Sequence, residues 1–286
     1  MTAPPEQRAS VNGQSIAYEV TGTGPAVLVL HGFPQTRAMW RPVARHLATR
    51  FTVVAADLRG YGASSKPTGA RHYTFREMGR DMAALMAHLG HDRYHLVGHD
   101  RGARTAHRMA LDDAAPLLSL TLMDIVPTHH LLDDLTARVA TSYYHWFFLA
   151  QPAPFPERLI GADPDYFFES CLLGWGGARL ADFDPALVAE YRKAWRDPAT
   201  ISAMCDDYRA ALRFDVHDDA ADLGRRLALP ALVLYGADGA MARAYDVPAT
   251  WAPRLSDMHR ASLPGGHFFP DTAPDATARA LMDFLA

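Results

Sequence analysis

The residues best placed to do chemistry stand at positions 98–102, Gly-His-Asp-Arg-Gly. A short apolar run precedes them and a helical pattern follows, which is the arrangement of a nucleophile elbow, G-x-Nuc-x-G. Because the turn is tight, the flanking glycines allow the strand and helix backbones to approach closely. Asp100 stands where serine is usual, and an ionised aspartate needs no base before it attacks carbon. The pattern therefore predicts hydrolysis in two steps through an aspartyl ester.

A histidine and an acid on later loops complete this pattern. His267 follows the last predicted strand in a Gly-Gly-His loop, and we expect it to deprotonate the water that attacks the ester of Asp100. Two acids are candidates to orient the histidine: Asp124, after the strand that follows the elbow helix, and Asp238, in Tyr-Gly-Ala-Asp-Gly. We favour Asp124, because the Gly-x-x-Asp spacing usual after the later strand would place the acid at position 239, which is glycine.

The sequence also contains groups that can donate hydrogen bonds to negative charge at Asp100 or on its substrate. The backbone N–H groups of Phe33, in a His-Gly-Phe loop, and of Arg101 are the pair expected to bind the oxyanion. Arg101 and Arg104 lie three apart, on one face of the following helix. Guanidinium groups bind carboxylates in a bidentate manner, so this pair predicts an anionic substrate. The alternative is that one arginine pairs with a structural acid.

Strands that alternate with helices must position these groups. A hairpin is expected over residues 8–20. Apolar runs typical of buried strands lie at 26–30, 51–56, 94–97, 118–126, 231–235 and 260–263, and helical spacing at 75–89 and 273–285. Such alternation implies right-handed crossovers and a mostly parallel sheet with helices on both faces. The chain order of nucleophile, acid and histidine is that of an α/β-hydrolase fold.

The stretch from about 127 to 225 has a different character, with aromatic residues in helical segments and no apolar strand runs. Insertions of this kind over the carboxyl edge of an open α/β sheet usually cover the ligand crevice. We therefore predict a core formed by residues 1–126 and 226–286, with a helical cap formed by residues 127–225.

The composition limits the class of protein. Of the 286 residues 49% are hydrophobic and 21% charged, as in ordinary globular proteins, and the net charge of −4 gives no reason to expect nucleic acid or a membrane as partner. Cys171 and Cys205 make no disulfide framework, and no cluster has metal-site spacing, so we expect no metal or cofactor. The first residues lack the apolar run of a signal peptide, and no apolar stretch approaches the roughly 20 residues that span a bilayer. A cytoplasmic protein is expected.

Several segments together carry a family resemblance. The more specific are Gly-His-Asp-Arg-Gly-Ala-Arg at 98–104 and Tyr-His-Trp-Phe-Phe-Leu-Ala-Gln-Pro-Ala-Pro at 144–154; the others lie at 31–36, 57–62, 122–128, 204–209 and 265–270. Over nearly its full length the chain resembles the fluoroacetate and haloacetate dehalogenases of the α/β-hydrolase fold. The resemblance implies that His145, Trp146 and Tyr208 hold the halide, that Trp175 lies near the substrate carboxylate, and that the protein is a homodimer.

These observations predict hydrolytic dehalogenation of short 2-haloacids, such as fluoroacetate or chloroacetate, to 2-hydroxyacids and halide. The closest enzymatic alternative is an epoxide hydrolase, which also uses an aspartate at the elbow. That chemistry relies on cap tyrosines and gives the paired arginines no obvious role. A non-catalytic receptor for small molecules is disfavoured because nucleophile, acid and histidine are all present, although a fold alone does not settle function.

Overall fold

The structure, a computed structural model, describes residues 4–133, 135–174 and 177–286. Within those ranges eight strands form one sheet in the order β1-β2-β4-β3-β5-β6-β7-β8. The strands are β1 (Gln7–Val11), β2 (Gln14–Thr21), β3 (Ala26–Leu30), β4 (Thr52–Ala56), β5 (Tyr94–His99), β6 (Leu117–Met123), β7 (Leu227–Gly236) and β8 (Leu255–Leu263). The β1–β2 and β2–β4 pairs are antiparallel, and every other neighbouring pair is parallel. The mostly parallel sheet predicted from the sequence is confirmed.

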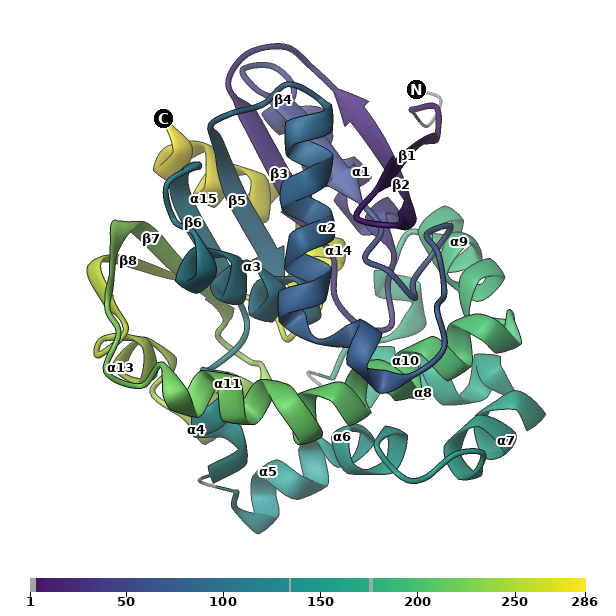
Figure 1. Ribbon diagram of the computed structural model, residues 1–286. Coiled ribbons are helices and arrows are strands. Elements are labelled where there is room, and N and C mark those ends of the chain that lie inside the picture. The colour runs from purple at the N-terminus through teal and green to yellow at the C-terminus, as the bar shows by residue number, and fades with distance from the viewer. Residues whose placement is uncertain (1–3, 134, 175–176) are drawn as a thin grey trace.

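Helices cover both faces of the sheet (Figure 1). In the view shown, α2 (Phe75–His88) and α3 (Arg101–Asp112) lie in front of it, and α1 (Arg41–Leu47) and α15 (Pro274–Leu285) lie behind. A strand that is covered on both faces must be apolar at every position. All five residues of β3, Ala-Val-Leu-Val-Leu, are accordingly buried.

Most of the predicted strands and helices are confirmed, and the differences lie at their ends. The strand predicted over 118–126 ends at Met123, because Asp124 takes a backbone φ of +51° and begins a loop. β8 begins at Leu255, five residues before the prediction of 260–263. It pairs only with β7 at the edge of the sheet, and its many exposed polar residues conceal the strand pattern.

Between Thr128 and Ala221 the described residues form helices and connecting loops without a strand. These helices are α4 (Thr128–Asp133), α5 (Ala137–Ser142), α6 (Tyr144–Leu149), α7 (Phe155–Ala162), α8 (Pro164–Gly174), η3 (Leu180–Asp182), α9 (Pro185–Trp195), α10 (Pro198–Ala210), the π-helical η4 (Ala211–Asp215) and α11 (Val216–Ala221). Figure 1 shows them gathered on one side of the sheet, with both chain termini toward the opposite side. The division at 126/127 and 225/226 into core and cap remains a prediction.

The remaining helices are short and connect the larger elements. They are η1 (Arg37–Trp40), η2 (Ala70–Tyr73), α12 (Ala240–Ala244), α13 (Val247–Trp251) and α14 (Phe269–Thr272). No helix formed by the described residues is long and apolar enough to cross a membrane.

Buried carboxylates fasten the helical layer to the sheet region. Asp215, in the π-helical turn that continues α10, accepts a hydrogen bond of 2.9 Å from the backbone N–H of Phe75 at the start of α2. Asp271, on α14, accepts hydrogen bonds from Gln35 and from the hydroxyl of Tyr191 on α9. Burial raises the pKa of both carboxyl groups to about 7. The helical layer is thus attached through specific polar contacts as well as by packing.

Candidate active site

Asp100 lies at the tip of the sharp turn between β5 and α3. Its backbone angles, φ +49° and ψ −114°, are ones that residues with side chains rarely adopt. A Cβ atom on Gly98 would lie 2.4 Å from the carbonyl oxygen of Gly102, and one on Gly102 would lie 2.4 Å from that of His31. Only glycine fits at either position, as the elbow pattern predicts.

The backbone of the loop after β3 reaches the carboxylate of Asp100. Phe33 donates its N–H to Oδ1 of Asp100 at 2.9 Å. A Cβ atom on Gly32 would lie 2.4 Å from Cβ of Asp100, so this loop can come as close only with glycine there. Arg101 begins α3, where the first N–H groups have no partner within the helix. Of the two N–H groups predicted to bind an oxyanion, that of Phe33 therefore lies at the elbow carboxylate, and that of Arg101 directly follows Asp100 in the chain.

His267 lies between two carboxylates. Its Nδ1 lies 2.6 Å from Oδ2 of Asp124, and its Nε2 lies 3.8 Å from Oδ2 of Asp100. Because an ionised carboxylate only accepts, the short contact places a proton on Nδ1. The other oxygen of Asp124 accepts the N–H of Gly236, at the end of β7, at 2.9 Å. The acid is thus fixed by the neighbouring strand, and the imidazole is aimed at the elbow.

Asp238, the second candidate acid, has a different set of contacts. Its Oδ2 accepts the backbone N–H of Gly265 at 3.0 Å, which braces the loop before His267. A Cβ atom on Gly239 would lie 3.6 Å from both carboxylate oxygens of Asp124. An acid at 239 would therefore occupy the same region as Asp124, and the geometry favours Asp124 as the partner of His267.

The electrostatic environment prepares Asp100 and His267 for different protonation states. Burial raises the pKa of Asp100, but the charge of His267 and the hydrogen bond from Phe33 are among the effects that outweigh it, so the pKa falls to about 2. For His267, burial lowers the pKa, while the hydrogen bond and charge of Asp124 reverse this and raise it above 6.5. At neutral pH Asp100 is therefore ionised.

Arg101 and Arg104 have different partners. Arg101 is fully buried and pairs with Asp207 of α10, which is the alternative that the sequence left open for one of the two. Arg104 donates Nη1 to the carbonyl of Val126 at 3.1 Å and to the hydroxyl of Thr128 at 3.0 Å. Among the described residues Nη1 of Arg101 and Nε of Arg104 are buried without a hydrogen-bond partner. Each arginine therefore retains a nitrogen with which it can bind a ligand.

His145, Trp146 and Tyr208 are brought together, as the resemblance implies. The ring of Tyr208 lies 5.5 Å from that of His145 and 5.3 Å from that of Trp146, and all three side chains are buried. Nε1 of Trp146 and the hydroxyl of Tyr208 have no hydrogen-bond partner among the described residues. Burial lowers the pKa of His145 well below 6.5, so the three groups form a neutral cluster rich in N–H and O–H donors. Trp175 lies outside the described residues.

Comparison with known proteins agrees with the fold. The sequence pattern of the alpha/beta hydrolase fold family matches residues 25–274. The chain belongs to this family. It is 55% identical to a fluoroacetate dehalogenase of Burkholderia sp over 93% of this chain and 89% of that protein. A soluble epoxide hydrolase of Corynebacterium sp. (strain C12) is 29% identical over 98% of this chain and 96% of the relative. The crystal structure of a putative alpha/beta hydrolase from Nostoc sp PCC 7120 superposes with a TM-score of 0.96, at 44% identity, covering 99% of this chain and 98% of that one.

This α/β-hydrolase also has residues around the site that the sequence analysis did not single out. His99 lies beside Asp100, and its Nε2 lies 2.8 Å from the backbone carbonyl of His267; burial lowers its pKa to about 4. Tyr143 is buried, with its ring 5.5 Å from that of His145. His99 and Asp207 each directly precede a predicted site residue, and Tyr143 lies two positions before His145; this proximity in the sequence is the signal that could have found them.

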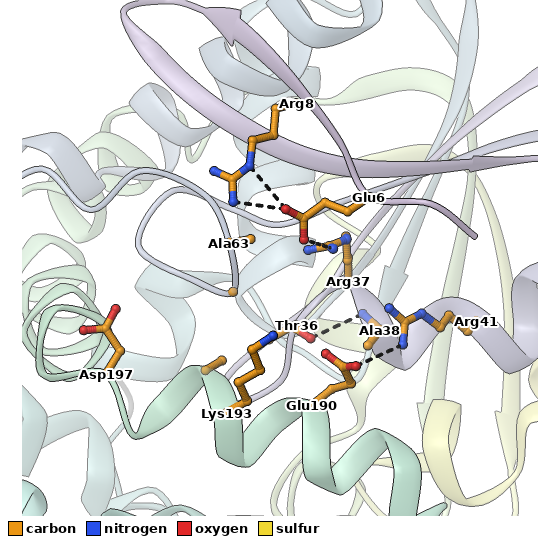
Figure 2. A pocket seen from close by; sticks show the side chains of 12 residues that line it. Glu6, Arg8, Thr36, Arg37, Ala38, Arg41, Ala63, Glu190, Lys193 and Asp197 are labelled. Atoms are coloured by element: carbon orange, nitrogen blue, oxygen red, sulfur yellow. Dashed lines mark hydrogen bonds and ion pairs between the residues drawn. The ribbon is translucent and has the colours of Figure 1, made fainter. Parts of the chain in front are cut away.

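A hollow of about 290 Å³ lies where α9 faces η1 and the N-terminal strand (Figure 2). Its charged side chains are largely paired with one another: Glu6 binds Arg8 and Arg37, and Arg41 lies 3.9 Å from Glu190. None of the residues that line it belongs to the elbow or to the aromatic cluster. The charges compensate within the hollow, and we assign it no ligand.

Proposed function

We propose that this α/β-hydrolase is a haloacetate dehalogenase that converts fluoroacetate, chloroacetate and similar short 2-haloacids to 2-hydroxyacids and halide. The observation that carries the proposal is the setting of the ionised Asp100. Phe33 donates its N–H to Asp100, and the ring of Phe33 lies 5.6 Å from that of His145 and 5.2 Å from that of Tyr208. Cζ of Arg104 lies 4.8 Å from the ring centroid of Trp146. Nucleophile, carboxylate site and halide site are thus available together. The similarity to the Burkholderia fluoroacetate dehalogenase supports the same function.

In the first step one oxygen of Asp100 attacks C2 of the haloacid. Because the N–H of Phe33 is already bonded to Oδ1, Oδ2 is the oxygen free to form the new C–O bond. The C–halogen bond breaks and the halide leaves with the electron pair, so Asp100 becomes an ester. No proton is transferred in this step, since the carboxylate is ionised and the leaving group is an anion.

Donors that meet the departing halide lower the barrier of this step. A C–F bond is strong, and fluoride leaves only where its developing charge is hydrogen-bonded. The N–H groups of His145 and Trp146 and the hydroxyl of Tyr208 supply such donors, and they bind halide more strongly in the transition state than in the C–halogen ground state. Arg101 and Arg104 hold the carboxylate of the substrate and offset its repulsion by Asp100.

In the second step water cleaves the ester. Nε2 of His267 takes a proton from water, whose oxygen attacks Cγ of Asp100, and the N–H groups of Phe33 and Arg101 bind the oxyanion on Oδ1. When the intermediate collapses, the C–O bond at Cγ breaks and the 2-hydroxyacid leaves with a proton from His267. Asp124 stabilises the imidazolium between these transfers. The balance is haloacid plus water giving hydroxyacid, halide and one proton.

An epoxide hydrolase is the second candidate. It is favoured by two buried cap tyrosines, Tyr143 and Tyr208, whose pKa values are raised well above 10, mainly by burial and also by the charge of Asp100 among other groups. Such tyrosines could protonate an epoxide oxygen. This function leaves the buried nitrogens of Arg101 and Arg104 without a role, and the epoxide hydrolase relative is less similar than the dehalogenase.

The assignments to the cytoplasm and to a homodimer are also proposals. Both cysteines, Cys171 and Cys205, are free, which suits a reducing compartment. Large apolar side chains of the helical layer are exposed at Phe155, Leu159 and Tyr166, as expected of a surface that packs against another copy. Light scattering of the purified protein tests the dimer.

A halide-release assay with fluoroacetate, chloroacetate and styrene oxide tests the function. Dehalogenation predicts fluoride or chloride release and glycolate formation, with no diol from styrene oxide. Diol formation without halide release would instead establish the epoxide hydrolase. Tight binding of haloacetate without any turnover would favour a receptor. The variant Asp100→Ala is the control for halide release that does not depend on the nucleophile.

A further inference from the structure

Asp207 is a fully buried acid that the mechanism above does not use. It lies on α10, directly before Tyr208, and pairs with Arg101 on α3. Nε of Arg101 donates to Oδ2 of Asp207 at 2.9 Å, and Nη2 donates both to Oδ1 and to the backbone carbonyl of Asp207, the latter at 3.0 Å. The hydroxyl of Tyr61 donates to Oδ2 of Asp207 at 2.7 Å. Two of the three guanidinium nitrogens are therefore bonded to Asp207. The third, Nη1, has no hydrogen-bond partner among the described residues.

Aromatic rings enclose the same guanidinium group. Its Cζ lies 4.4 Å from the ring centroid of Tyr208, 4.6 Å from that of Phe75 and 5.1 Å from that of Trp146. Cations stack favourably on such rings, so the rings help to hold the guanidinium in the orientation that Asp207 sets. The plane of Arg101 is thus fixed by Asp207 at one edge and by aromatic faces around it.

We propose that Asp207 is a positioning residue for the haloacid: it fixes Arg101 so that Nη1 meets the substrate carboxylate, and it keeps Arg101 from pairing with Asp100. The inference rests on the proposed function. Removing one member of a buried ion pair leaves the other charge without compensation. Without Asp207, the guanidinium would turn to another carboxylate, and Asp100 is adjacent in sequence. Such a pair would occupy the nucleophile and withdraw Nη1 from the substrate.

The negative charge of Asp207 by itself predicts the opposite change in carboxylate affinity, so an experiment can separate the two effects. Asp207 is a negative charge near the place where an anionic substrate must bind. If it acted only through that charge, its removal would strengthen the binding of a carboxylate. If it orients Arg101, its removal weakens that binding. The direction of the change in affinity therefore separates the two effects.

The test compares Asp207→Asn and Tyr61→Phe with Asp206→Asn as matched control. Asp206 is the preceding acid on α10 and is also paired, with Arg209 at 3.0 Å and the N–H of Gly69 at 2.9 Å. Acetate binding by calorimetry measures the carboxylate site, and bromide binding by quenching of tryptophan fluorescence measures the donor cluster. Turnover of chloroacetate gives kcat and KM, and thermal unfolding gives Tm.

We expect Asp207→Asn to weaken acetate binding by roughly 10- to 150-fold, the loss of a charge-assisted hydrogen bond, and to raise KM for chloroacetate in parallel. Bromide binding should change little, and Asp206→Asn should leave both ligands unaffected. Unchanged or tighter acetate binding in Asp207→Asn would overturn the proposal. So would a parallel loss of acetate and bromide binding with a lower Tm, since that is the result of a merely structural role.

Tyr61→Phe keeps the ion pair between Arg101 and Asp207, so it tests the positioning role of Asp207 if Asp207→Asn does not fold. It removes one hydrogen bond to Asp207, so acetate binding should weaken at unchanged Tm, and unaltered acetate binding would contradict the proposal. A wild-type protein that binds acetate but releases no halide from chloroacetate would contradict the proposed function instead. The acetate affinities of the variants would still decide the role of Asp207.

Discussion

Nε2 of His267 lies 3.8 Å from Oδ2 of Asp100, too far for a hydrogen bond. This separation suits a histidine that does not activate the nucleophile. The charge of His267 and the hydrogen bond from Phe33 are among the effects that keep Asp100 ionised against burial, with a pKa of about 2. The imidazole is instead close enough to act on a water directed at Cγ once the ester has formed.

Replacing His267 should separate the two steps of the reaction. In His267→Asn, Asp100 can still displace halide, but no base activates the water. We expect one equivalent of halide to be released and the ester to persist. Mass spectrometry should find a carboxymethyl group on the peptide that contains Asp100. Sustained turnover, or an unmodified peptide after the halide burst, would contradict the assigned role of the histidine.

Asp124 and Asp238 give a direct comparison of the two candidate acids. Asp124→Asn should lower kcat by about 10³- to 10⁴-fold, as the loss of an orienting acid does in comparable triads, because His267 would adopt the wrong tautomer. Asp238→Asn should retain turnover, since the side chain of Asp238 accepts the backbone N–H of Gly265 and makes no hydrogen bond to His267 among the described residues. Steady-state kinetics of both variants measures the difference, and the reverse ranking would assign the role to Asp238.

The sequence was sufficient for the groups that lie on strand ends, because the parallel sheet brings those ends together. Asp100, His267 and Asp124 therefore meet as expected, although they are separated by up to 167 positions. The pairing of Arg101 with Asp207 was not predictable in the same way. It joins two helices 106 residues apart, and no periodicity specifies which face of α10 turns toward α3.

The donor cluster should matter most for the poorest leaving group. Tyr208→Phe and Trp146→Phe each remove one donor and keep an aromatic ring, although the phenyl ring is smaller than the indole of Trp146. We expect kcat for fluoroacetate to fall by roughly 10- to 100-fold, the value of one hydrogen bond to a charged group, and kcat for bromoacetate to fall much less. Halide release from the two substrates measures this ratio. An equal loss with both substrates would indicate that these rings only pack.

Lowering the pH should stop hydrolysis of the ester before it stops displacement of the halide. Deprotonated His267 is required as the base, so turnover should fall as the pH drops through its pKa, which lies above 6.5. Asp100, with a pKa of about 2, remains ionised over that range and continues to displace halide. Rapid quenching below the pKa of His267 should therefore find accumulated ester. Halide bursts that vanish together with turnover would show that both steps depend on the same group.

The ester at Asp100 is the central claim, and a single turnover in H₂¹⁸O tests it most directly. With enzyme in excess over chloroacetate, water attacks Cγ, so ¹⁸O should appear in the carboxylate of Asp100, and the glycolate should carry an unlabelled hydroxyl from Oδ2. Mass spectrometry of the glycolate and of the Asp100 peptide reads both positions. Label in the first-formed glycolate, with none in Asp100, would mean that water attacks the substrate directly and would contradict the mechanism.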